Sequence, residues 1–124
     1  MADVNSSRTI VDSFQAAETI PQFAAVSLSS SGTIVNTNWP DSVSVSNFLG
    51  IALNANFAGL PVDVCMFGIV ENPAWVFEPM KPVYLYYMGV VTQTNPGESL
   101  RKIGKAITPH KLFVAPSDLL MLSQ

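Results

Sequence analysis

A stretch of thirteen residues that occurs twice decides the fold: VSLSSSGTIVNTN at Val26–Asn38 and VYLYYMGVVTQTN at Val83–Asn95. The two copies align without gaps and share five identical residues. Each begins with Val-x-Leu, an alternation that points both apolar side chains to one face of a strand. A glycine follows, Gly32 or Gly89, and supplies the positive φ that a tight reversal needs. The pattern predicts two β-hairpins of the same design.

A second block repeats in the same order, with GIAL at Gly50–Leu53 answered by GKAI at Gly104–Ile107. The small residues of Gly-x-Ala let a strand run close to a neighbouring backbone. The repeat therefore covers residues 26–53 and 83–107. A duplicated hairpin element of this kind predicts an all-β fold, a compact barrel or sandwich with two pseudo-repeated halves.

The segments outside the repeat also favour strands. Val62–Met66 alternates apolar side chains with Asp63 and Cys65, and Gly68 is placed for a bulge or a sharp bend. Trp75–Phe77 is expected to form a short aromatic strand, and Leu112–Val114 the final one.

Prolines and glycines leave no long window of helical periodicity. Ser7–Ala17 alone suits a short helix, and an extended arm suits it equally well. We therefore expect an N-terminal arm, residues 1–18, followed by a single β domain, residues 19–124.

Scarce charge is the main feature of the composition. Charged residues make up 12% of the chain, against about 25% in an ordinary soluble domain. No run of about 18 apolar residues suits a membrane span, and the N-terminus lacks the pattern of a signal peptide. We expect a soluble chain made in the cytoplasm. Between Thr19 and Val62 the only charged residue is Asp41, which suits a surface packed against neighbouring subunits. Contacts within a homo-oligomer or a lattice are therefore expected in preference to a monomer with a bland surface.

The charge is also unevenly distributed: residues 1–80 carry a net −6 and residues 81–124 a net +3. Arg101, Lys102, Lys105 and Lys111 supply most of this basic character. They suit either a solvated pair of strands or contact with an acidic neighbouring protein. Nucleic-acid binding is not expected, because the net charge is −3 and no basic–aromatic module is present.

No catalytic residue, metal ligand or cofactor-binding motif is predicted. His110 is the only histidine and lies in a turn sequence, while Cys65 stands alone in an apolar run and is expected to be buried. Trp75, Tyr84 and Tyr86 suit core or interface packing, or the stacking platform of a carbohydrate-binding module.

Several motifs taken in order resemble the small decoration (cement) proteins of tailed-bacteriophage capsids. They are LGIAL at Leu49–Leu53, AG followed by V-x-V at Ala58–Val64, GIV at Gly68–Val70, KPVYL at Lys81–Leu85, GVVT at Gly89–Thr92 and IGKAI at Ile103–Ile107. The resemblance spans residues 20–115. It implies a non-enzymatic β domain that binds the exterior of the assembled capsid, often as a trimer, and reinforces the shell of coat protein.

The resemblance also implies that an N-terminal arm lies on the coat lattice. The interface residues expected from the arm, the uncharged loop and the basic tail are Val4, Ile10, Val11, Phe14, Trp39, Arg101, Lys102 and Lys105. Two alternatives stay open: a β module of a phage tail, fibre or baseplate, and a carbohydrate-binding or adhesion module.

Overall fold

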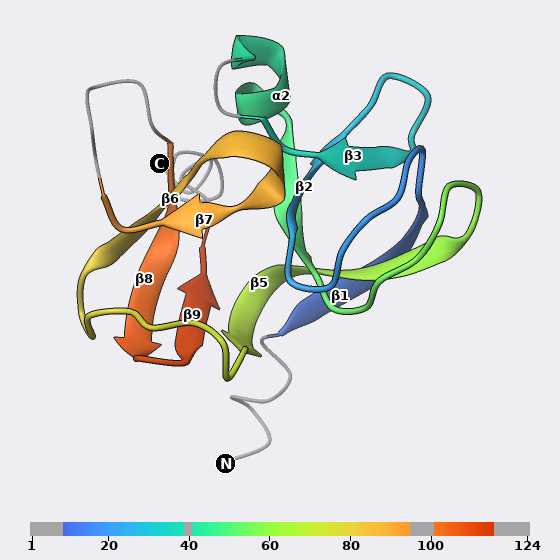
Figure 1. Cartoon of the computed structure of the whole chain (residues 1–124). Coiled ribbons are helices and arrows are strands. Elements are labelled where there is room, and N and C mark those ends of the chain that lie inside the picture. Colours follow the sequence, from blue (N-terminus) through green and yellow to red (C-terminus); the bar gives the residue numbers. More distant parts are fainter. Residues whose placement is uncertain (1–8, 39–40, 95–100, 116–124) are drawn as a thin grey trace.

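The structure, a computed structural model, describes residues 9–38, 41–94 and 101–115, and over these it is all-β, as predicted. The elements, shown in Figure 1, are β1 (Ile10–Gln15), β2 (Ala25–Leu28), β3 (Ile34–Asn36), α2 (Ser42–Ser46), β4 (Phe48–Ala52), β5 (Pro61–Glu71), β6 (Pro82–Leu85), the 3₁₀ helix η1 (Tyr87–Gly89), β7 (Val91–Thr92), β8 (Lys102–Thr108) and β9 (Lys111–Val114). The described part of the expected arm is extended, and it pairs with β5 as β1.

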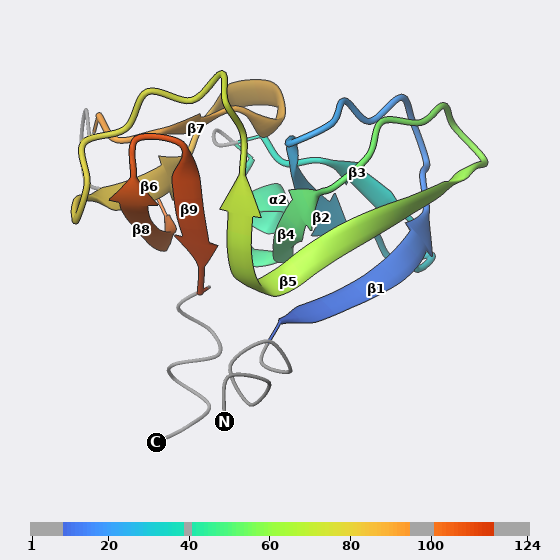
Figure 2. The same cartoon turned by 90° about the horizontal axis from the view of Figure 1, so that it is seen from below.

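Strand β5 belongs to two halves of the molecule. Its first part pairs with β1 and β4, and from Gly68 onward it pairs with β9. A register shift opposite Ile10 and Val11 precedes Gly68, whose φ of +134° favours glycine. The bend predicted at this glycine is therefore confirmed, and Figure 2 shows β5 curving from one half of the molecule into the other.

The two halves have the same strand order. Unit one is β3-β2-β4-β5-β1, using residues 61–67 of β5, and unit two is β7-β6-β8-β9-β5, using residues 68–71. The registers also agree. Val26 pairs with Gly50 as Val83 pairs with Gly104, and in both units the next residue follows a bulge. The chain is thus an internal duplication whose units share one bent strand.

The glycines of the second repeated block lie against backbone. A Cβ at Gly50 would collide with the carbonyl oxygen of Cys65, and a Cβ at Gly104 with that of Phe113. The close strand approach expected from Gly-x-Ala is therefore present in both units.

Each unit encloses its own core. Val26 and Ala52 of unit one are fully buried, as are their equivalents Val83 and Ala106 in unit two. Four side chains on the other face of the unit-one sheet join the core of unit two: Ala25, Phe48, Ile51 and Cys65. The units are therefore packed together through apolar contacts and not merely linked by β5.

The units differ at the seam, which is the place where the two edges of each unit's sheet approach each other. In unit one a bridge between Ala16 and Ile34 joins the end of β1 to β3, with Ala17 N donating to Ile34 O at 2.9 Å. The strand predicted at Trp75–Phe77 in unit two is wrong, because this segment lies outside the sheet. The backbone amide of Trp75 forms a turn in place of a strand pair, because Trp75 N donates to Asn72 O at 3.0 Å.

A side chain spans the seam of unit two in place of a backbone bridge. The Gln93 amide accepts from Glu78 N at 2.8 Å and donates to Glu78 O at 2.9 Å. Asn36, the equivalent residue of unit one, also reaches across its seam and donates to Thr19 O at 3.0 Å.

Candidate docking surfaces

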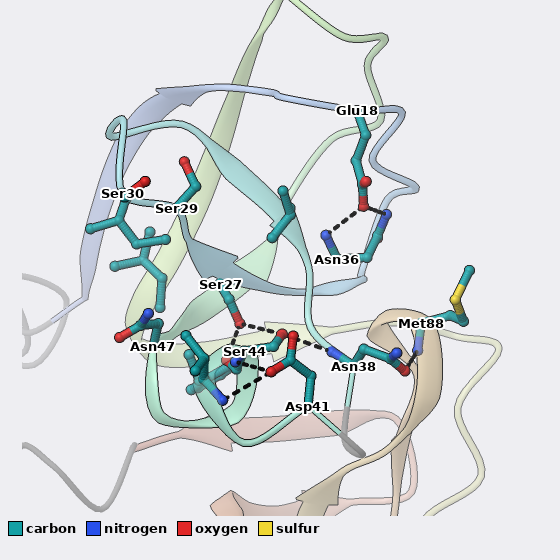
Figure 3. A pocket seen from close by; sticks show the side chains of 15 residues that line it. Glu18, Ser27, Ser29, Ser30, Asn36, Asn38, Asp41, Ser44, Asn47 and Met88 are labelled. Atoms are coloured by element: carbon teal, nitrogen blue, oxygen red, sulfur yellow. Dashed lines mark hydrogen bonds between the residues drawn. The ribbon is translucent and has the colours of Figure 1, made fainter.

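A hollow of about 930 Å³ lies between the β2–β3 hairpin and α2, and both apolar side chains and hydroxyl and amide groups line it (Figure 3). Ser27 Oγ lies 2.6 Å from Thr37 Oγ1 and donates to Ser44 O at 2.6 Å. Ser44 Oγ accepts from Asn38 N at 3.0 Å. These polar groups hold the short helix against the hairpin.

The acidic groups around this hollow also have structural partners. Asp41 caps α2, since its Oδ1 accepts from Val43 N at 3.0 Å and Ser44 N at 3.4 Å. Glu18 Oε2 accepts from Asn36 N and Nδ2 at 3.0 and 2.9 Å. These polar groups of the hollow therefore fix local structure.

In residues 9–38, 41–94 and 101–115 no three His, Cys, Asp or Glu side chains lie close enough to hold a metal ion together. His110 is exposed, and its Nδ1 lies 2.7 Å from Trp75 O. Cys65 is buried as expected, and this burial raises the pKa of its thiol. No helix within the same ranges is long and apolar enough to span a membrane.

The arm residues expected at an interface have different surroundings. Ile10 and Val11 are 48% and 46% exposed on β1, whereas Phe14 packs against the core of unit one. Val4 and Trp39 lie outside the described residues.

The three basic residues expected at an interface also separate. Lys102 and Lys105 are exposed on β8. Arg101 is half-buried, donates from Nη1 to Val45 O at 2.7 Å, and lies 5.7 Å from the centre of the Phe48 ring. It therefore ties unit two to the α2–β4 region of unit one.

One surface brings together the arm and the basic tail. Ile10 pairs with Phe67, the Phe67 and Phe113 rings are 5.3 Å apart, and Phe113 pairs with Lys105. Directly paired residues point to the same face of a sheet. Ile69, 54% exposed, also pairs with Phe113. We name this surface, which crosses four adjacent strands, the outer strip: Ile10, Phe67, Ile69, Phe113 and Lys105.

The sequence interpretation missed the aromatic centre of the outer strip. Phe67 and Phe113 are half-buried against each other, outside both cores. Strand alternation could have found Phe113, because it stands between the buried Leu112 and Val114.

A second apolar surface lies where the units meet. The Trp75 ring lies 5.6 Å from that of Phe23, beside a cleft of about 250 Å³. The cleft is also lined by Met88 and Val90, which are 69% and 55% exposed. Val76, next to Trp75, is 87% exposed. We name this surface the junction face: Phe23, Trp75, Val76, Met88 and Val90.

The other aromatic residues considered for a stacking platform are Tyr84 and Tyr86, both half-buried. Tyr86 packs against Tyr87 with ring centres 4.5 Å apart. No protein-family model matches the chain, and no curated protein matches it.

Proposed function

We propose that this chain is a structural protein of a tailed bacteriophage that binds the exterior of the capsid and stabilises the shell. The resemblance of residues 20–115 to capsid decoration proteins suggests the partner, the major capsid protein. The outer strip carries the proposal, because it is a continuous surface that joins Ile10 of the arm to the basic residue Lys105 across β5 and β9. On this proposal, the outer strip faces the coat lattice.

The chemistry of the outer strip suits such a contact. Ile10 and Ile69 offer exposed apolar area beside the half-buried rings, and burying such area is the main driving force of protein association. Lys105 at its edge can pair with a carboxylate of the partner, which would aid orientation more than affinity. Four paired strands support the strip, so little backbone freedom is lost on binding.

Cosedimentation with undecorated, mature capsids tests the proposal. We expect saturable, stoichiometric binding and a higher melting temperature of the shell. The absence of binding would overturn the proposal, and binding to isolated tails in its place would favour a tail module.

The outer strip itself is tested by Ile69→Asp, which puts a charge at its centre. We expect capsid binding to weaken at least about tenfold, since truncated central contacts often cost more than about 1.4 kcal/mol. Leu60→Asp is the matched control, because Leu60 is 45% exposed but lies on the loop before β5. Equal binding by both variants would rule out the strip as the docking surface.

A further inference from the structure

The two units differ in the chemistry of equivalent surface positions. The gapless alignment of the repeat places Met88 and Val90 of unit two on Ser31 and Thr33 of unit one. The β2–β3 and β6–β7 hairpins share their register, so these residues occupy equivalent places at the hairpin ends. Unit one has hydroxyl groups there, which form hydrogen bonds with each other and with Ser29. The fold therefore does not require apolar residues at this end of unit two.

The apolar residues at this end of unit two form one patch. The cleft of about 250 Å³ lies beside a second hollow of about 500 Å³, and both are lined by Trp75 and Val91. Val76, the most exposed large apolar residue described, lines the second hollow. A prominent side chain and an apolar cleft thus lie next to each other on one surface.

Charge does not oppose contact between two such surfaces. Among the described residues, no charged one lines the cleft. Glu78 lines the neighbouring hollow, and its carboxylate is 3.9 Å from Lys81 Nζ. Although the chain has a net charge of −3, two copies can therefore bring their junction faces together without placing like charges opposite each other.

The junction face also lies away from the proposed lattice contact. In Figure 2 β1 and the bend of β5 lie on the lower side, while the segment between β5 and β6 and the η1 region lie on the upper side. Both surfaces can therefore be covered at the same time.

We propose that the junction face binds the junction face of a second copy of this chain, with Val76 of each copy entering the apolar cleft of the other. A surface that carries both a protruding group and its receptor is self-complementary, as a symmetric contact between identical subunits requires. A stable contact needs about 800 Å² from each partner, roughly a ninth of the chain's 7043 Å² surface. This inference does not depend on the proposed capsid function.

Light scattering and sedimentation of the purified full chain, from about 1 to 100 micromolar, test the proposal. We expect a dimer, with twice the 13.4 kDa mass of the chain, and not the trimer that the resemblance implies, because each copy fills the cleft of the other. The double variant Met88→Ser/Val90→Thr gives unit two the residues of unit one and should raise the dissociation constant at least tenfold. Val76→Thr is the second variant; because Val76 is 87% exposed, its replacement should leave folding intact.

Ile69→Thr is the matched control, since it removes an exposed apolar group from the outer strip and should leave the mass unchanged. A wild-type mass of 13.4 kDa at every concentration would overturn the proposal. It would also be overturned if folded Val76→Thr associates as tightly as wild type, or if Ile69→Thr weakens association equally.

Discussion

Unit one and unit two have the same strand order and the same registers, but they differ at the seam and in their exposed loops. Unit one joins β1 to β3 through the backbone bridge between Ala16 and Ile34. In unit two the Gln93 side chain connects to Glu78 across the corresponding gap. The strand order and the registers within each sheet are shared, whereas the seam and the exposed loops differ. Strand pairing within each sheet is therefore the constraint that both units obey.

The largest expected effect tests whether the units are equivalent in their strand contacts. Gly50→Ala and Gly104→Ala each place a Cβ against the carbonyl oxygen of the adjacent strand. A backbone atom cannot give way as a flexible side chain can, so we expect each change to cost about 3 kcal/mol or more. Urea unfolding followed by circular dichroism measures both.

Gly59→Ala is the control for these two substitutions. Gly59 has a positive φ, +89°, but a Cβ added there would meet open space, so only the backbone strain of about 1 kcal/mol should remain. If Gly50→Ala or Gly104→Ala were no more costly than this control, the close packing of that unit would not be essential, and the comparison of the units would fail there.

The next effect sharpens a difference between the units. Ser27→Ala should cost about 1–3 kcal/mol, because it removes a buried hydroxyl that bonds Thr37 Oγ1 and Ser44 O. The equivalent residue of unit two is Tyr84, which is half-buried. We expect Tyr84→Phe to change stability by less than about 0.5 kcal/mol. Thermal unfolding of both variants measures the contrast, and equal losses would contradict it.

Sequence predicted the elements whose geometry depends on special residues. The two hairpins turn at Gly32 and Gly89, with φ of +86° and +80°. These glycines are identical residues of the aligned repeat, so the sequence reveals both turns. The equivalence of β1 with the end of β5 could not be predicted in this way. Val11 and Ile69 occupy equivalent places opposite Cys65 and Phe113. Any apolar residue suits these positions, so the two strands share no identical residue there that would reveal their equivalence in the sequence.

Helix α2 was not predicted for a different reason. Its sequence, Ser-Val-Ser-Val-Ser, has the alternation of a strand. The cap formed by Asp41, together with the bond from Ser27 Oγ to Ser44 O, holds it in a helical turn. The outer strip was predicted in part. Ile10 and Lys105 were expected at an interface, but their pairing with Phe67 and Phe113, whose rings meet at the bend of β5, was not.

The smallest expected effect concerns Cys65, whose equivalent in unit two is the half-buried Phe113. Burial raises the pKa of the Cys65 thiol, so the folded chain keeps this proton more tightly than the unfolded chain. As pH rises above the ordinary thiol pKa of about 8.5, the unfolded state loses its proton first and is favoured. Stability should therefore fall above this pH, by at most about 1.4 kcal/mol per pH unit from this group. Cys65→Ala should lose stability less steeply between about pH 8.5 and 10, measured by urea unfolding at each pH. If the free energies of unfolding of the wild type and Cys65→Ala fell in parallel with pH, water would reach the thiol at the surface where unit one packs on unit two. The apolar contact between the units would then be looser there than the cores on either side.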